Sequence, residues 1–173
     1  IVANWKMQLS QADVRVRLTL LRKALSRIPD YMTIVVCPTS SAPDSASQLV
    51  KGSAMHLGAQ NVYWTDRGAF TGEVSPTQLI ELGVQYVIVG HSERRIHLRE
   101  DNVMVGRKAV AALSHGLQPI ICIGETADQR AAEQQDQVVQ EQLDEALRSL
   151  PPPAKGKQVA IAYEPVWAIG TGE

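Results

Sequence analysis

Residues 119–129 read Pro-Ile-Ile-Cys-Ile-Gly-Glu-Thr-Ala-Asp-Gln, and they contain a complete change from strand to helix. The first five residues form a short apolar run, which is typical of a buried strand. Thr126 stands three positions before Gln129, and this is the spacing of a capping box at a helix N-terminus. The stretch therefore predicts a strand, a short loop and a helix in immediate succession.

The same alternation extends in both directions along the chain. Five further apolar runs predict strands at Ile1–Trp5, Met32–Cys37, His56–Ala59, Tyr86–Val89 and Val159–Tyr163. They do not alternate cleanly between apolar and polar residues, which favours strands covered on both faces, as in a parallel sheet. Strands that alternate with helices along the chain predict an α/β fold, either an open doubly wound sheet or a closed barrel. A dinucleotide-binding fold is disfavoured, because no Gly-x-Gly-x-x-Gly follows the first strand.

Two longer segments, Val14–Ile28 and Ala127–Leu150, carry apolar residues at helical spacing and predict amphipathic helices. In the second segment the residues expected to face inward are Val138, Val139, Leu143, Ala146 and Leu147. The Gln, Glu and Asp residues on its other side are expected to form a solvated face. Further helices are expected to begin at the N-caps Ser10, Ser75 and Ser92.

The composition is that of a single globular domain over residues 1–173, with 45% hydrophobic and 20% charged residues. Seventeen Lys and Arg residues nearly balance 18 Asp and Glu residues, which argues against nucleic acid or a membrane surface as the main partner.

Neither a membrane span nor a secretory signal is visible. Cys37 and Cys122 lie in predicted strands, and we expect them to be reduced core residues of a cytoplasmic protein.

Chemically useful residues follow three predicted strands, at the strand ends where parallel α/β proteins bind ligands. Lys6 follows the first strand, and a cation there suits a phosphate or a developing enolate. His91 follows the fourth, where a neutral imidazole can donate a hydrogen bond to a carbonyl oxygen. Glu164 follows the sixth and is a candidate general base. No metal-ligand spacing, Walker loop or nucleophile elbow occurs, so we expect neither a metal nor a cofactor.

Each of these residues also has an ordinary structural interpretation. Lys6 could be a surface lysine and His91 a histidine bonded to its local backbone, while Glu93 is either a partner of Lys6 or a first-turn acid favoured by the helix dipole. Residues 165–172 combine apolar side chains with Gly170 and Gly172, a composition that suits a lid over a charged substrate. The alternative is an ordinary loop that packs one tryptophan.

Three segments together resemble the triosephosphate isomerase family: Asn4-Trp5-Lys6-Met7, Val89–Arg95 and Ala162–Gly172. Residues 58–62, 68–73 and 122–125 extend the resemblance over the whole chain. It implies a (β/α)8 barrel, of which this sequence covers about six strands. It also implies the interconversion of dihydroxyacetone phosphate and D-glyceraldehyde 3-phosphate through an enediolate, a step of glycolysis and gluconeogenesis that needs no cofactor.

The resemblance also implies roles for single residues. Glu164 would be the base that moves a proton between C1 and C2 of the substrate, and neutral His91 would polarise its carbonyl group. Lys6 would stabilise negative charge on the phosphate and the enediolate, and Asn4 would hold the substrate. The backbone N–H of Gly170, on the lid, would bind the phosphate.

Supporting and interface residues follow from the same resemblance. Glu93 and Cys122 would support the site. The Asn61–Ser75 segment resembles the long interface loop of the family, with Thr71 near its tip reaching the site of the partner subunit. Thr71 and Gln60 are therefore expected at the interface of a homodimer.

The sequence departs from the family pattern in three ways. Ala3 stands where the family usually has Gly, and Glu173 stands where Lys is common beyond the lid. A barrel of this type has about 250 residues, so two C-terminal βα units are missing from the predicted barrel. We expect the isolated 173-residue chain to be aggregation-prone and nearly inactive, because its sheet edges would be open.

Two other functions remain compatible with the residues. The first is a non-catalytic fragment that acts only by association through the interface loop. The second is another phosphate-binding barrel enzyme, which is disfavoured because the lysine, histidine and glutamate segments occur together.

Overall fold

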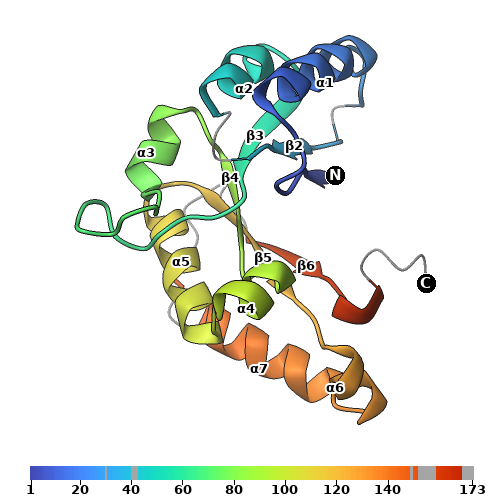
Figure 1. Ribbon diagram of the computed structural model, residues 1–173, viewed down its shortest axis with the longest axis vertical. Coiled ribbons are helices and arrows are strands. Elements are labelled where there is room, and N and C mark those ends of the chain that lie inside the picture. Colours follow the sequence, from blue (N-terminus) through green and yellow to red (C-terminus); the bar gives the residue numbers. More distant parts are fainter. Residues whose placement is uncertain (30, 40–42, 149, 152–158, 169–173) are drawn as a thin grey trace. The chain divides into compact units, whose positions relative to one another are not determined.

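The computed structural model describes residues 1–29, 31–39, 43–148, 150–151 and 159–168. The chain divides into two compact units, Ile1–Val87 and Ile88–Glu173, which we call unit 1 and unit 2. Both are built from parallel strands and helices (Figure 1). No helix in the described part of the chain is long and apolar enough to span a bilayer.

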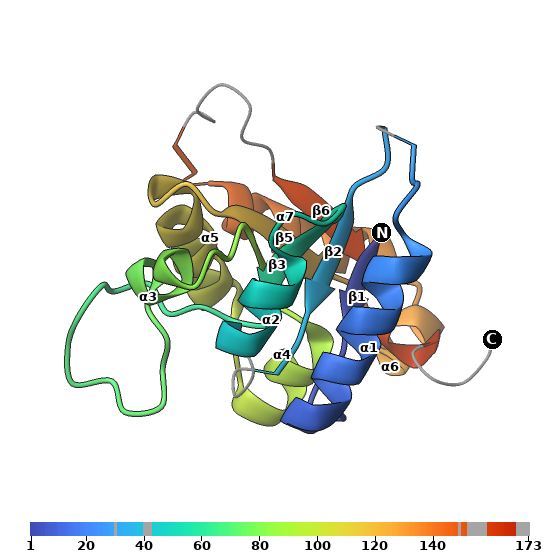
Figure 2. The ribbon, with the colours of Figure 1, turned by 90° about the horizontal axis from the view of Figure 1, so that it is seen from above.

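Unit 1 contains the strands β1 (Val2–Asn4), β2 (Ile34–Cys37) and β3 (Met55–Ala59) and the first half of β4 (Tyr86–Val89). These strands pair in chain order, and every pair is parallel. The helices are α1 (Gln11–Ala24), α2 (Pro43–Val50) and α3 (Pro76–Glu81). Helices α1 and α2 lie side by side in both views (Figures 1 and 2), and α2 also contacts β3.

Unit 2 contains the second half of β4 and the strands β5 (Gln118–Ile123) and β6 (Ala160–Tyr163), of which β5 and β6 pair in parallel. Its helices are α4 (Ser92–Leu98), α5 (Asn102–Ser114), α6 (Ala127–Ala131) and α7 (Gln135–Leu147), followed by the 3₁₀ turn η1 (Val166–Ala168). Helices α5 and α7 pack against each other and against β5. All six predicted strands are therefore present, within two residues of their predicted bounds.

Local capping explains where several helices begin. The predicted N-caps Ser10, Ser75 and Thr126 each form a complete capping box, which the residue three positions later closes. The prediction for Ser92 is wrong, because the N-cap of α4 is His91 and Ser92 is the first helical residue.

The predicted helix over residues 127–150 is also wrong in its continuity. Glu133 has a φ of +57°, a left-handed conformation that a right-handed helix cannot contain, and it separates α6 from α7. The face of α7 that is buried therefore differs from the expected one. Leu147, which was expected to face inward, is 42% exposed, while Gln142 is buried.

The expectation that the strands are covered on both faces holds for the inner strands only. Every residue of β2 is buried, as are five of the six residues of β5. By contrast, Val2 of β1 and Ile161 of β6 are 45% and 44% exposed. Each of these two strands pairs with a single neighbour among the described residues, β1 with β2 and β6 with β5.

Candidate active site

His91 leaves β4 and is held in a single orientation by its own turn. Its ring is buried, and Nδ1 accepts a hydrogen bond of 3.2 Å from the backbone N–H of Glu93. A nitrogen that accepts a hydrogen bond carries no proton, so the neutral ring has its proton on Nε2. The Glu93 carboxylate also lies 3.6 Å from Nδ1. His91 thus presents an N–H donor on the side of the ring opposite to Glu93.

Glu164 directly follows β6 and faces that donor. Its backbone N–H donates to the carbonyl oxygen of Ile123, at 2.7 Å, which continues the β5–β6 ladder by one residue. One carboxylate oxygen, Oε1, lies 3.6 Å from Nε2 of His91. The other, Oε2, is buried and has no hydrogen-bond partner in the described part of the chain. The structure therefore brings a proton donor and a carboxylate acceptor together at the ends of β4 and β6.

Asn4 and Lys6 come together in unit 1, at the end of β1. The Oδ1 atom of Asn4 accepts a hydrogen bond of 3.0 Å from the backbone N–H of Lys6, whose φ is +49°. A non-glycine residue rarely adopts this conformation, and such strain is found most often at functional sites. Gln60 donates from Nε2 to the carbonyl oxygens of Lys6 and Cys37, both at 2.9 Å. The segment after β1 is thereby fixed by two side-chain amides.

Comparison with known proteins decides the family. The family model described as triosephosphate isomerase matches residues 1–173. Triosephosphate isomerase from Chloroflexus aurantiacus is 46% identical over the whole chain, which covers 68% of that relative. Those from Roseiflexus castenholzii and Trichodesmium erythraeum are 44% and 42% identical, also over the whole chain, which covers 67% and 70% of them. The chain belongs to the triosephosphate isomerase family. This membership confirms the predicted fold class and the predicted isomerase function.

Within this isomerase, two charged side chains hold the turn that carries His91. The preceding residue, Gly90, has a φ of +72°, and a Cβ atom there would lie 2.9 Å from Val105. Glu100 accepts a hydrogen bond of 3.2 Å from the Gly90 N–H, and Arg95 donates to the Gly90 carbonyl oxygen at 2.8 Å. Arg95 also donates to the carbonyl oxygen of Cys122 on β5, at 3.3 Å. Cys122 thus supports the turn through its backbone.

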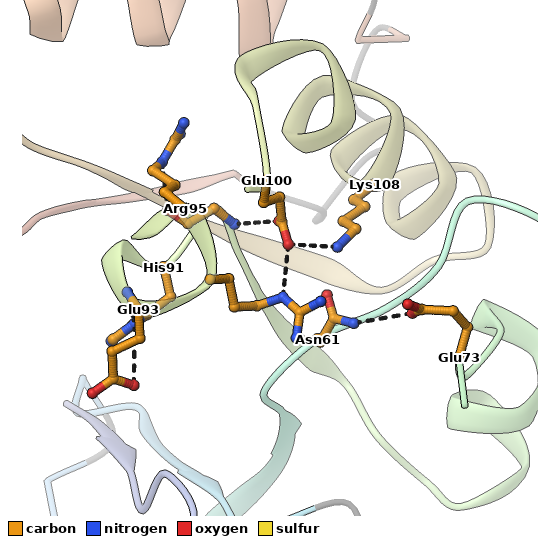
Figure 3. A network of polar contacts seen from close by, with 9 residues as sticks. Asn61, Glu73, His91, Glu93, Arg95, Glu100 and Lys108 are labelled. Atoms are coloured by element: carbon orange, nitrogen blue, oxygen red, sulfur yellow. Dashed lines mark hydrogen bonds and ion pairs between the residues drawn. The ribbon is translucent and has the colours of Figure 1, made fainter. Parts of the chain in front are cut away.

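Glu100 is the centre of a buried charge network (Figure 3). Its Oε2 atom lies 2.7 Å from Nζ of Lys108 and 2.6 Å from Nε of Arg94. Glu100 and Lys108 are 3% and 1% exposed. Burial by itself raises the pKa of Glu100, but the hydrogen bonds and positive charges of Lys108 and Arg94 outweigh it and hold that pKa below its ordinary value.

A second buried carboxylate holds the segment that follows Glu164. Glu125, which is fully buried, accepts hydrogen bonds from the Tyr163 hydroxyl at 2.9 Å and from Nε1 of Trp167 at 3.0 Å. Burial raises the pKa of Glu125, but these bonds and the charge of Arg130 lower it below its ordinary value. Arg130 lies 3.7 Å from Glu125 and over the Trp167 ring. Residues 163–167 are therefore fastened to the end of β5.

The predicted interface residues lie in unit 1. Thr71 is exposed, in a long irregular segment between β3 and α3. Tyr63 stacks on Trp64 in this segment and packs against Phe70, with ring centroids 4.1 and 4.5 Å apart. Gln60 is half-buried, and its side chain donates to the backbone carbonyl oxygen of Lys6, as described above.

Three predicted positions, Gly170, Gly172 and Glu173, lie outside the described residues. Sequence reasoning missed Glu100, Lys108, Glu125 and Gln142. The available signal for Glu125 was an acidic residue after a buried strand, together with aromatic donors in the segment after Glu164. No group of three or more metal-ligating side chains occurs in the part of the chain that the structure describes.

Proposed function

We propose that Glu164 and His91 carry out the proton transfers of triose phosphate isomerisation in this chain. The observation that carries the proposal is the separation of 3.6 Å between Glu164 Oε1 and His91 Nε2. Because Nδ1 of His91 accepts a hydrogen bond from the Glu93 N–H, Nε2 is the donor nitrogen of the neutral ring. The carboxylate faces the imidazole without bonding to it, so both groups can act on one substrate. This division of roles is the one already established for the family.

The reaction requires a base and an acid that act on adjacent carbon atoms. Glu164 removes a proton from C1 of dihydroxyacetone phosphate, and the electron pair moves to the C2 carbonyl oxygen, which His91 protonates. Glu164 then delivers its proton to C2 while the C1 hydroxyl proton leaves to His91, and the product is glyceraldehyde 3-phosphate. Each group ends the cycle in its starting protonation state.

The remaining assignments concern substrate charge and orientation. We propose that Lys6 stabilises the negative charge of the phosphate and the enediolate, and that Asn4 orients the substrate. The Asn4–Lys6 hydrogen bond and the strained Lys6 backbone support this assignment. Gly170 is proposed to bind the phosphate through its N–H, with Glu93 as a supporting residue beside His91.

We also propose that the protein is a cytoplasmic homodimer whose interface includes the Asn61–Ser75 loop, with Thr71 and Gln60. The exposed Thr71 and the 42% exposed Phe70 support an interface there, because such a loop gains burial on association. Cys37 and Cys122 are both free and buried, which fits a reducing compartment.

The test is the turnover of Glu164→Asp in the full-length protein. Shortening the side chain by one methylene withdraws the carboxylate by about 1 Å, which can lower kcat about 100-fold. Glu141→Asp, at an exposed position on α7, is the matched control and should keep full turnover. Unchanged turnover of a folded Glu164→Asp variant would remove Glu164 from the mechanism.

A further inference from the structure

The backbone of Glu164 depends on an unusually close approach between β5 and the segment after β6. Gly124 lies directly beside Glu164, and a Cβ atom at Gly124 would overlap the carbonyl oxygen of Glu164. The backbone N–H groups of Glu164 and Val166 donate to the carbonyl oxygens of Ile123 and Glu125, at 2.7 and 3.0 Å. The position of the Glu164 backbone is therefore set by residues 123–125.

The backbone N–H and C=O of Gly124 bond to helix α7 and not to the segment after β6. Successive residues of a strand direct their N–H and C=O groups to opposite sides. Because the carbonyl groups of Ile123 and Glu125 face the segment after β6, both polar groups of Gly124 face away from it. The helix α7 supplies their partner. The Gly124 N–H donates to Oε1 of Gln142 at 2.8 Å, and Nε2 of Gln142 donates to the Gly124 carbonyl oxygen at 3.2 Å.

Gln142 is built into the protein rather than placed on its surface. It is 9% exposed, and Ala146, one helical turn later on the same face of α7, is 1% exposed. A buried amide that bonds to both the N–H and the C=O of one residue fixes the two peptide groups that flank that residue, because neither bond can be replaced by water without opening the core. The Gln142 side chain therefore controls the orientation of the Gly124 backbone.

We propose that Gln142 is a positioning residue for catalysis, which holds Gly124 so that the Glu164 carboxylate is set against the substrate. The inference rests on the proposed role of Glu164 as the base. It predicts that a change on helix α7, with no contact to the substrate, lowers the rate of proton transfer while leaving substrate binding nearly unchanged.

The experiment uses Gln142→Met in the full-length protein, which keeps the side-chain length and removes both hydrogen bonds. We expect kcat to fall about tenfold with KM within about twofold, since a misplacement of about 1 Å can cost up to about 100-fold in rate. Gln137→Met is the matched control, because Gln137 lies on the same helix, is exposed, and should leave kcat unchanged. Rates are referred to the folded fraction measured by urea unfolding.

A double-mutant cycle with Glu164→Asp separates positioning from a general structural effect. In Glu164→Asp the carboxylate is already displaced, so Gln142→Met should lower kcat less than about threefold there, whereas independent effects would multiply. A multiplicative effect, or a kcat of Gln142→Met equal to that of Gln137→Met, would overturn the proposal. If Gln142→Met does not fold, Gln142→Asn replaces it, because the shorter amide cannot span both Gly124 groups.

The cycle also distinguishes failure of the proposed base, Glu164, from failure of the proposed positioning residue, Gln142. Full turnover of Glu164→Asp would refute the proposed base, and with it any positioning role. A strong loss in Glu164→Asp with no loss in Gln142→Met would refute the role of Gln142 alone.

Discussion

At the scale of single residues, the buried Glu100 carboxylate controls both stability and its pH dependence. Removing the carboxylate in Glu100→Gln deprives the buried Lys108 ammonium of a charged partner at 2.7 Å. Breaking such a buried pair costs about 3–5 kcal/mol of unfolding free energy. Urea unfolding at neutral pH measures this loss. Glu141→Gln, at an exposed position, should change stability by less than about 0.5 kcal/mol.

The lowered pKa of Glu100 also fixes the sign of the pH effect. Folded Glu100 binds its proton less tightly than the unfolded chain does, so its stabilisation is complete above the ordinary carboxyl pKa of about 4.3. This stabilisation is lost as the pH falls through the lowered pKa of the folded state. The unfolding free energy of Glu100→Gln should therefore depend less on pH in this acidic range. An equal slope for variant and parent would contradict the assignment.

At the scale of elements, the packing of β2 against β3 depends on a glycine. A Cβ atom at Gly58 would overlap the sulfur of Cys37 and lie 2.8 Å from Val35. Cys37 is fully buried, and burial raises the pKa of its thiol to about 12, so the sulfur acts as an apolar core atom. Gly58→Ala should therefore cost about 1–3 kcal/mol through overpacking.

A second substitution tests this explanation of the Gly58 contact. Cys37→Ala removes the sulfur that the new methyl group would meet, so the double variant should be more stable than the sum of the two single effects predicts. Urea unfolding of all four proteins provides the comparison. Strict additivity would show that the strain of Gly58→Ala arises elsewhere.

At the scale of the whole molecule, we predict a dimer formed through the Asn61–Ser75 loop, and we expect a substitution at one exposed residue of this loop to dissociate it. Thr71→Arg places a charged side chain at the centre of the proposed interface and should convert the full-length protein to a monomer in size exclusion with light scattering. Thr19→Arg, on the exposed face of α1, is the control and should remain dimeric. A dimeric Thr71→Arg protein would place the interface elsewhere.

The sequence allowed the order of strands and helices to be predicted, because short apolar runs and capping boxes are local signals. The same signals placed His91 and Glu164 at strand ends, where the structure brings them to 3.6 Å. Gln142 and Lys108 could not be predicted in this way. Both are polar residues on amphipathic helices, where solvent exposure is the usual outcome, and their burial depends on the tertiary partners Glu100 and Gly124, which lie outside those helices.

The break at Glu133 shows a second limit of sequence reasoning. Residues 127–150 have a continuous helical pattern, yet one left-handed residue divides them and changes the face that α7 buries. A single backbone conformation of this kind leaves no apolar signal in the sequence. The hydrophobic pattern was sufficient to predict that these residues are helical, but not to predict which face of α7 is buried.

The most direct test of the central claim is deuterium incorporation during isomerisation in D₂O. A base that moves a proton between C1 and C2 exchanges some of it with solvent, so the parent protein should introduce deuterium at these carbons. Glu164→Gln keeps the shape of the side chain but cannot accept the proton, and it should reduce incorporation at least about 100-fold, whereas Glu141→Gln should match the parent. Deuterium incorporation by folded Glu164→Gln at the rate of the parent would contradict the assignment of Glu164 as the base.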